Sequence, residues 1–351
     1  MIGGAGIWAL RRCPDGCERR AVWNGCDICT HSFFMAAWDG AGMAELSIEK
    51  TKTIQYSRKL QSALQQTASR LRGLVTVHTG IRDKLFEIPK IGKRSLSKST
   101  GGKTDTPDNA NTFSKRWMAP EWWEDGYLHD RQINLETQFG DQIVTKTQEA
   151  QLAACERTID ERIIEACLGD ALDGENGTGK VVLPASQKIA MNAVYGKAPD
   201  VPADTGLTFD KIRLARAKLV KSEAMKRGDK AIFLVSVAQL MELLGDEKAT
   251  NAQYAAVKAL MDGDLKTSFM GFEWVQTEHL PYDPDKKMRT CVAYVREAVD
   301  FAFWEDSRTE ITIRTDKKNC TQIYTVIGLG GVRSEDKGVV AVECYEEPDV
   351  A

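Results

Sequence analysis

The sequence has little net charge, few histidines and no long apolar run. Its 47 basic and 50 acidic residues leave a formal net charge of −3, so no overall attraction to nucleic acid or to a membrane surface is expected. No apolar run approaches the roughly 18 residues that a membrane-spanning helix needs. The four histidines stand apart and form no H-x-x-x-H pair: His31, His78, His129 and His279. These absences argue against a membrane protein and against the common histidine-based metal sites.

Motifs for catalysis are missing as well. There is no G-x-S-x-G sequence, and no cysteine has a histidine at a suggestive spacing. Residues 174–180 match the phosphate-binding pattern G-x-x-x-x-G-K, but Val181 follows where a magnesium-binding serine or threonine is needed, and the preceding element is a predicted helix rather than a strand. We interpret this segment as a glycine-rich surface loop. The sequence therefore predicts no catalytic, cofactor-binding or metal-binding residues, and a protein that is not an enzyme.

The first 42 residues differ in character from the rest. Four of the nine cysteines crowd into them: Cys13, Cys17, Cys26 and Cys29. The two pairs are separated by only eight residues, which is tight for a zinc ribbon or finger even with His31 nearby. The other five cysteines are scattered among apolar neighbours, as in a reduced cytosolic protein. We therefore expect a non-native leader at residues 1–43, with Met43 as the start of the native protein, and an N-terminal arm at residues 44–73.

The stretch from Gln142 to Asp170 carries the strongest helical signal. It has no glycine or proline between Thr145 and Leu168, and its apolar residues recur every three or four positions: Leu152, Cys155, Ile159, Ile163 and Cys167. The pattern predicts a helix over 145–169, with Thr145 as its N-cap and Gly169 at a positive φ. The opposite face is charged, and its acids, which include Glu156, Asp160 and Glu161, are expected to form solvated ion pairs.

A polar and basic segment precedes this helix. Between residues 92 and 112 the only large apolar residue is Leu96, so the segment cannot bury enough surface to order on its own. From Arg82 to Arg116 nine basic residues face four acidic ones, which suits either a nucleic-acid-binding arm or a loop that docks on an acidic partner surface. Its polar part has no aromatic residue, which leaves stacking on bases unsupported. We expect the aromatic residues that follow to pack as the base of this loop: Phe113, Trp117, Trp122, Trp123 and Tyr127.

The remaining sequence mixes helical and strand patterns. Before the loop, an extended arm turning into a helix is predicted over 47–71, and strands are predicted over 74–77 and 84–91. After the long helix we expect a helix from Thr208 to Arg227, a strand over 231–235, a helix capped by Ser236 and a further helix over 251–263. Strands are then expected over 270–275, 290–295, 301–304, 310–314, 322–327 and 339–344, with turns at 281–284, 316–319 and 328–331. This order is typical of an α+β fold.

The order of these parts resembles the major capsid proteins of tailed bacteriophages, which share the Hong Kong 97-like fold. The resemblance extends from Leu46 to about Glu343 and is carried by RTIDERIIEACLGDALDG at 157–174, FLVSVAQLMELLGDEKAT at 233–250, GFEWVQTEHLP at 271–281 and GLGGVRSEDKGVVAVEC at 328–344. It implies an α+β fold with an extended β-hairpin loop at 74–130, a peripheral domain with a spine helix at 131–206, an apical α/β domain at 207–304, peripheral-domain return strands at 305–346 and a tail at 347–351.

The resemblance also implies a function. The chain would be the structural major capsid protein that self-assembles into the icosahedral head shell around phage DNA, within the virion and after assembly in the cytoplasm of a bacterial host. Its partners would be copies of itself in hexamers and pentamers, a portal, decoration proteins in some shells and packaged DNA by non-specific contact, with no membrane. No long coiled-coil segment precedes the arm, so we expect a separate scaffolding protein. The candidate intersubunit contacts are Lys93, Arg94, Lys98, Lys103, Trp117, Trp122, Trp123, Glu156, Asp160 and Glu161.

Other interpretations stay open at this point. An encapsulin-type nanocompartment shell would share the fold but enclose protein cargo. A nucleic-acid-binding protein would use the basic loop as a monomer, with steep salt dependence, and a nucleotide enzyme would bind ATP at Lys180. Some capsid proteins cross-link a loop lysine to an asparagine through a glutamate. Lys98, Lys103, Asn319 and Glu335 are suitable residue types, but any capsid protein has some of them, and we predict no cross-link.

Overall fold

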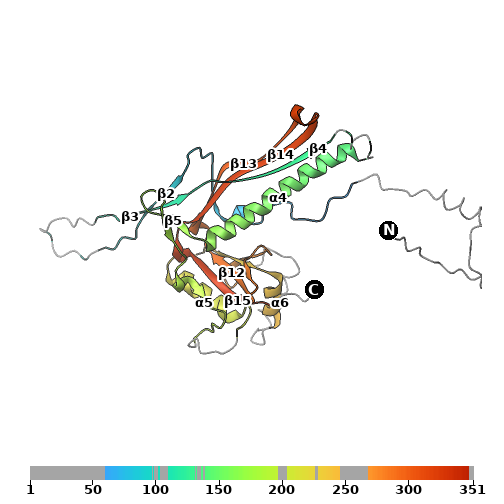
Figure 1. Cartoon of the computed structure of the whole chain (residues 1–351). Helices are drawn as coiled ribbons and strands as arrows, with labels where there is room; N and C mark the ends of the chain where they lie inside the picture. The colour runs from blue at the N-terminus through green and yellow to red at the C-terminus, as the bar shows by residue number, and fades with distance from the viewer. Residues whose placement is uncertain are drawn as a thin grey trace, which may run out of the picture. The chain divides into compact units, whose positions relative to one another are not determined.

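The computed structural model describes residues 60–96, 98, 102, 110–130, 132, 136, 139–196, 204–225, 228–245 and 268–347 of the 351-residue chain. All of them belong to one compact unit that begins at Arg58. The expected leader and the expected helix over 251–263 lie outside the described residues. Within them, the long helix α4 (Gly140–Leu168) accompanies a seven-stranded sheet and two four-stranded sheets (Figure 1).

The seven-stranded sheet forms the core of the α/β part of the chain. Its order is β7-β15-β12-β8-β10-β9, with β11 beside β12. The strands are β7 (Lys188–Ile189), β8 (Ala231–Val235), β9 (Ser268–Phe269), β10 (Phe272–Gln276), β11 (Tyr282–Asp283), β12 (Met288–Tyr294) and β15 (Val339–Tyr345). Every residue of β8 is buried, as expected of a central strand that is covered on both faces. Phe233 of this strand packs against Trp274 of β10, with ring centroids 4.6 Å apart.

Two helices accompany this sheet. Helix α5 (Phe209–Lys221) lies against β15 and β7, and the Thr208 side chain accepts a hydrogen bond from the Lys211 N–H, as the sequence predicted for an N-cap. The helix ends before Lys226 and Arg227, which corrects its expected C-terminus, because the chain turns at Ser222 and Glu223 takes a φ of 56°. Helix α6 (Val237–Gly245) begins after Ser236, whose hydroxyl accepts from the Gln239 N–H.

A long hairpin leaves this sheet between β12 and β15. The chain runs through a short 3-10 helix, η3 (Arg296–Ala298), into β13 (Val299–Arg314), returns along β14 (Cys320–Arg333) and passes through η5 (Asp336–Gly338) into β15. The two ends of this excursion lie side by side, because the Val295 N–H donates to Gly338 O and the Ser334 N–H to Ala298 O, both at 2.9 Å. With β1 (Thr76–Thr79) and β4 (Glu121–His129), these strands form the sheet β1-β13-β14-β4. The excursion is thus an extension of the β12–β15 pair.

Two expectations for this region are wrong. The strands expected over 301–304 and 310–314 form one continuous β13. The turn expected at 328–331 is also absent, because these residues continue β14. The turn over 316–319 is confirmed, with Lys318 and Asn319 at positive φ.

The glycines of β14 are explained by close packing rather than by a turn. A Cβ added at Gly328 would lie 2.8 Å from the Trp122 ring, and one at Gly331 would lie 2.7 Å from Cβ of Ala166 on α4. At Gly330 the Cβ would lie 2.6 Å from the carbonyl oxygen of Ala119. Glycine inside a strand often marks such a close approach. Gly328 and Gly331 thus let β4 and α4 lie tightly against β14, and Gly330 leaves room for Ala119, just before β4.

Gly330→Ala should therefore destabilise the protein by about 1–3 kcal/mol, the usual range for an overpacked core position. The added methyl group meets the Ala119 carbonyl oxygen and the Trp304 ring, and backbone must move to accept it. Gly126→Ala in the same sheet is the matched control, since its Cβ would make only an ordinary contact of 3.8 Å with Tyr324. Urea unfolding of both variants measures the difference. Equal midpoints for the two variants would contradict this account of β14.

Helix α4 (Gly140–Leu168) is the predicted long helix, and both predicted ends need correction. It begins five residues before Thr145, and its N-cap residue, Phe139, makes no side-chain capping bond. Gly169 has a φ of −71°, not a positive one. Glycine is needed there because a Cβ would lie 2.8 Å from Glu165 O, the atom to which the Gly169 N–H donates. The helix packs along β14, β13 and β4 (Figure 1).

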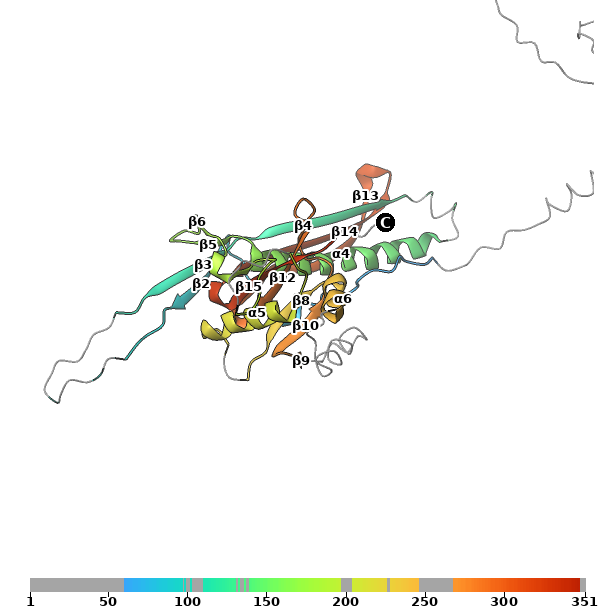
Figure 2. The same ribbon diagram turned by 90° about the horizontal axis from the view of Figure 1, so that it is seen from below.

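The expected extended hairpin is formed by β2 (Phe86–Ile91) and β3 (Phe113–Met118), which pair in antiparallel register. It continues into β5 (Ala171–Asp173) and β6 (Gly179–Val181), and both ribbon views show it extending away from the seven-stranded sheet (Figures 1 and 2). The glycine-rich segment interpreted as a surface loop connects β5 and β6. The aromatic residues do not form the packed cluster that the sequence predicted, since Phe113 is 69% exposed and Trp122 is 57% exposed.

Candidate functional site

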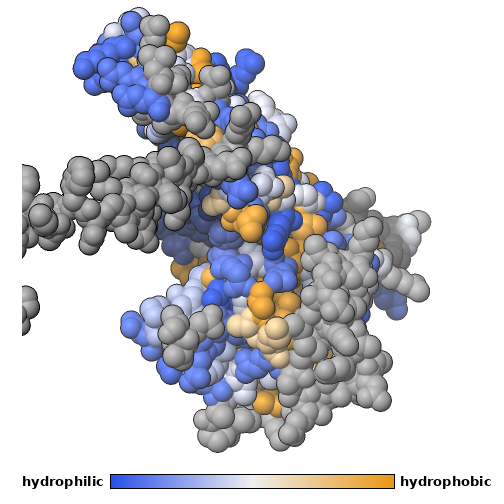
Figure 3. All heavy atoms as spheres, turned by 90° about the vertical axis from the view of Figure 1, so that its right-hand side faces the viewer, coloured by the Kyte–Doolittle hydropathy of each residue, from blue (hydrophilic) through white to orange (hydrophobic). Residues whose placement is uncertain are grey.

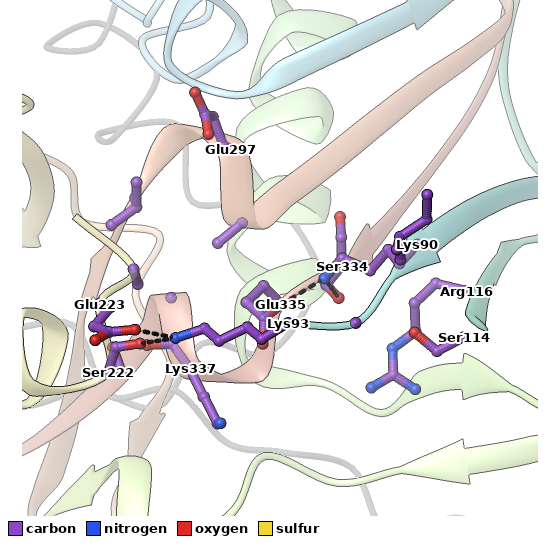
Figure 4. A pocket seen from close by; sticks show the side chains of 16 residues that line it. Lys90, Lys93, Ser114, Arg116, Ser222, Glu223, Glu297, Ser334, Glu335 and Lys337 are labelled. Carbon is purple, nitrogen blue, oxygen red and sulfur yellow. Dashed lines mark hydrogen bonds and ion pairs between the residues drawn. The ribbon is translucent and has the colours of Figure 1, made fainter. Parts of the chain in front are cut away.

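A groove lies at the base of the β2–β3 hairpin. It has a volume of about 590 Å³ and separates the end of β2 from the C-terminal turn of α5 and from η3 and η5 (Figure 4). Its charged lining residues have both signs: Lys90, Lys93, Arg116, Glu223, Glu297, Glu335 and Lys337. The groove is thus the place where the hairpin meets the α/β part of the chain.

Two lysines of the hairpin cross this groove. Lys90 Nζ donates to the Ser334 carbonyl oxygen and, at 2.9 Å, to Glu335 Oε2. Lys93 Nζ donates to Glu223 Oε2 at 2.6 Å and to the carbonyl oxygen of Ser222, the C-cap residue of α5. A cation is favourable at that end of a helix. The contact with Lys93 is exposed on both sides, so its contribution to stability is small.

The carboxylates of these two pairs respond to their lysines. The hydrogen bond from Lys93 and the charge of Lys93 lower the pKa of Glu223. Burial raises the pKa of Glu335, but the hydrogen bond and charge of Lys90, together with the charge and backbone N–H of Lys337, outweigh burial, so this pKa also lies below its ordinary value. Both carboxylates are therefore anionic at neutral pH and suited to hold the hairpin lysines.

A buried arginine joins the hairpin base to the end of α4. The Arg333 side chain is 0% exposed and donates to the carbonyl oxygens of Cys167, Gly169 and Val181. Its Nε donates to Asp336 Oδ1 at 2.7 Å, and Asp336 Oδ2 accepts from Arg116 of β3 at 3.0 Å. Carbonyl groups at a helix C-terminus lack partners within the helix. Arg333 supplies such partners and links α4, β6 and the hairpin through one charge network.

The residues before β1 are anchored on α4 through Glu156 and Asp160. We call residues 60–71 the arm segment. Asp160 accepts hydrogen bonds from Ser69 Oγ at 2.6 Å and from the Arg70 and Leu71 N–H groups at 3.1 Å. Glu156 accepts from the Ser69 N–H at 3.0 Å. The prediction of a helix reaching residue 71 is therefore wrong for the arm segment. In a helix these backbone N–H groups would donate to carbonyl oxygens one turn earlier, but here they donate to side chains of α4.

This arrangement also corrects the interpretation of the acids on α4. Asp160 is fully buried, so it is neither a solvated ion pair nor available to another subunit. Glu156 is half-buried and bound to the arm segment. Glu161 is exposed and pairs with His279 at 3.1 Å, which leaves it accessible.

The remaining predicted contact residues lie along the hairpin and β4. Lys93, Arg94 and Lys98 are exposed, whereas Lys103 lies outside the described residues. Trp117 Nε1 donates to Gly174 O at 2.7 Å, and the Arg162 guanidinium lies 4.8 Å from the centre of the Trp123 ring. Trp122 remains largely exposed beside Gly328. The structure thus gathers Lys93, Arg94 and Lys98 on the hairpin, but distributes the tryptophans over β3 and β4.

The sequence reasoning missed the Arg333 network. A signal for it exists, since Arg333 and Asp336 are three residues apart directly after a strongly apolar strand. It also missed a set of residue types that resembles a catalytic triad: His78, Asp300 and Ser334. Here the aspartate lies between the other two, with His78 Nε2 2.8 Å from its Oδ1 and the Ser334 hydroxyl donating to its Oδ2. In a catalytic triad the histidine contacts the serine and acts as its base. Here Asp300 stands between them, so His78 cannot activate the Ser334 hydroxyl.

No group of three or more histidine, cysteine, aspartate or glutamate side chains in the described ranges is arranged to hold a metal ion. Among the helices that the structure describes, none combines the length and apolar character needed to cross a membrane.

The model of the phage capsid protein family matches residues 48–346. The chain belongs to this family. No curated protein matches the chain. The α+β capsid fold expected from the sequence is confirmed, and this phage capsid protein is a structural component of the virion shell.

Solved capsid structures share the fold of this phage capsid protein at low sequence identity. The capsid of Ralstonia phage GP4 is 11% identical with a TM-score of 0.68, over 86% of this chain and 97% of that chain. The capsid of cyanophage P-SCSP1u is 14% identical with a TM-score of 0.61, over 86% and 95%. The mature capsid of bacteriophage PhiM1 is 12% identical with a TM-score of 0.59, over 84% and 93%. Identities this low show a common fold.

Proposed function

We propose that this phage capsid protein is the major subunit of the icosahedral head shell of a tailed bacteriophage. Copies of it assemble into hexamers and pentamers in the cytoplasm of the bacterial host, with a separate scaffolding protein and a portal, and the shell encloses DNA through non-specific contacts. Its role is structural and includes no catalytic step. The observation that carries this proposal is the family match over residues 48–346, which includes the whole of the β2–β3 hairpin.

The charge distribution supports a role for the hairpin in assembly. The segment from Arg82 to Arg116 has a net charge of +5, so the rest of the chain, with a total of −3, carries −8. A basic hairpin therefore meets a complementary charge on a neighbouring copy. Each exposed contact is worth less than about 1 kcal/mol. The same contact recurs at every subunit of a closed shell, and this repetition multiplies its effect.

Electron microscopy of the purified protein tests the proposal. Residues 43–351 and the full chain, each expressed with and without the scaffolding protein of the same phage, should form rings or closed shells. Nucleic acid inside native particles would support the head-shell function, whereas a defined protein cargo would indicate a nanocompartment instead. A strictly monomeric protein under all of these conditions would contradict the proposal.

Reversing the charge of the hairpin should block assembly without unfolding the subunit. We expect Lys98→Glu combined with Lys103→Glu to reduce assembled particles at least tenfold, because a small loss at each contact is repeated around the shell. The melting temperature should hardly change, since surface substitutions usually shift stability by under about 0.5 kcal/mol. Lys286→Glu combined with Lys287→Glu changes the net charge equally at an exposed turn away from the hairpin and serves as the control. Normal particle yield from the hairpin variant would show that its charge does not drive assembly.

A further inference from the structure

Strand β13 has a neighbour on both sides only over its first residues. β1 pairs with it at Asp300–Phe303, whereas β14 pairs with it as far as Arg314. Beyond Phe303, the described part of the chain places β14 on one side of β13 and no strand on the other. The backbone N–H and C=O groups on that side form a free edge, which is a template for another strand.

Over residues 309–314 this edge lacks three devices that protect many sheet edges: proline, lysine and a β-bulge. Residues 309–314, TEITIR, contain no proline or lysine, and the irregularities of β13 lie before them, between Phe303 and Arg308. Ile311 is 50% exposed and Ile313 is 69% exposed. They continue the face that α4 covers, since the partner of Ile311 on β14 is the buried Ile323. Figure 3, in which the end of the β13–β14 hairpin is uppermost, shows hydrophobic side chains exposed there among hydrophilic ones.

The sequence of the edge is complementary to itself in one antiparallel register. When two copies pair with Thr312 opposite Thr312, Ile311 of each lies opposite Ile313 of the other. In the same register Glu310 lies opposite Arg314, twice. Directly opposite residues of antiparallel strands share a face and interact, so apolar pairs and opposite charges stabilise the pairing.

Neighbouring registers lack this complementarity. A register centred on Ile311 sets Arg308 opposite Arg314, and one centred on Ile313 sets Glu310 opposite Asp316, so each opposes like charges. If one strand slips by one residue, Thr312 of one copy lies opposite Ile311 or Ile313 of the other. Because a one-residue slip exchanges the faces of a strand, the α4 helices of the two copies would then lie on opposite sides of the joined sheet.

We propose that two copies of this protein join edge to edge along β13, in antiparallel register centred on Thr312 and across a two-fold axis. The pairing gathers Ile311 and Ile313 of both copies into one apolar cluster between the two α4 helices. It extends the four-stranded sheet of each subunit into a sheet shared by both. The inference rests on the proposed function, since a closed icosahedral shell contains two-fold axes at which one surface patch meets its own copy.

A single cysteine at the axis tests this pairing. Directly opposite residues of antiparallel strands have Cα atoms about 4.5–5.5 Å apart, within the range that a disulfide spans. Thr312→Cys should therefore form a symmetric disulfide on mild oxidation of assembled protein. Cys320 lies diagonally opposite on β14 and is partly exposed, so the variant is made in a Cys320→Ser background. Trypsin cuts after Arg308 and Arg314 and releases the cross-link as two joined copies of peptide 309–314, which mass spectrometry identifies.

Ile311→Cys in the same background is the register control. In the proposed register two such positions are offset by two residues along the strand, so their Cα atoms lie about 8 Å apart, beyond disulfide range. We expect at least tenfold less cross-linked peptide than from Thr312→Cys. Combining Ile311→Cys with Ile313→Cys should restore the cross-link, because these positions face each other.

The outcomes separate this inference from the proposed function. Closed shells without the residue 312 cross-link overturn the edge pairing and leave the function intact. A dimer with the cross-link that never forms shells supports the pairing and contradicts the function. Equal cross-linking at residues 311 and 312 overturns the register. Uncross-linked monomers in every condition overturn both proposals.

Discussion

Replacing Arg333 with methionine should lower the free energy of unfolding by about 3–5 kcal/mol, because removing one partner of a buried ion pair leaves uncompensated groups behind. Methionine fills similar space but offers no donor. The carbonyl oxygens of Cys167, Gly169 and Val181 would lose their side-chain partner, and Asp336 would keep only Arg116. Denaturant unfolding of the unassembled subunit measures the loss.

Two companion variants make this prediction specific. Arg333→Lys keeps the charge but lacks the planar fork that reaches several acceptors, so its stability should fall between those of methionine and the natural arginine. Arg314→Met removes an arginine from the exposed pair with Asp316 and should leave the unfolding midpoint unchanged. If Arg333→Met matched the natural protein, the carbonyl groups at the end of α4 would have other partners.

Asp160→Asn should release the arm segment from α4. The carboxylate accepts from the Ser69 hydroxyl and from the N–H groups of Arg70 and Leu71. An amide has one acceptor oxygen instead of two and directs its NH₂ group at these donors, so the expected loss is about 3 kcal/mol, as hydrogen bonds to a buried charged group are worth about 1.5–3 kcal/mol each. Limited trypsin digestion should then cut after Arg70 and Arg72, sites that we expect to be cleaved slowly in the natural protein because its arm segment is held on α4.

Glu161→Gln, one position further along α4, is the control for this change. Glu161 is exposed, and its side chain pairs with His279. Its replacement should alter stability by less than about 1 kcal/mol and leave the trypsin pattern unchanged. Rapid cleavage at Arg70 in both variants would show that general loosening of α4, rather than loss of the Asp160 contacts, releases the arm segment.

Local sequence patterns were sufficient to predict an element whose formation depends mainly on its own residues. The spacing of Ile159, Ile163 and Cys167 predicted α4, and these residues are fully buried. Thr208 predicted the start of α5 because a capping side chain acts on a backbone group three residues away. The composition of residues 92–112 predicted a polar, basic loop because it excludes a core of its own, whereas the β-hairpin was implied only by the resemblance to capsid proteins.

Contacts between distant segments were beyond these patterns. Gly328, Gly330 and Gly331 predicted a turn, but their role depends on β4, α4 and Trp304, which are remote in the sequence. Asp160 carries the same local signal as the exposed Glu161, and only the arm segment about 90 residues earlier distinguishes them. The candidate contacts were predicted as surface charges and tryptophans, whereas Asp160 and Arg333, which join distant segments, are buried.

The β13–β14 hairpin is inserted between β12 and β15, which pair with each other. This placement lets the length of the hairpin change independently of the rest of the subunit. Because Val295 and Ala298 meet Gly338 and Ser334 at its root, the seven-stranded sheet closes whatever the length of the hairpin. Adding two residues to each strand moves the tip outward by about 6.6 Å and keeps every side chain on its original face, whereas adding one would invert the faces. The length of the subunit can thus change by two residues per strand at a time without any change in the α/β core.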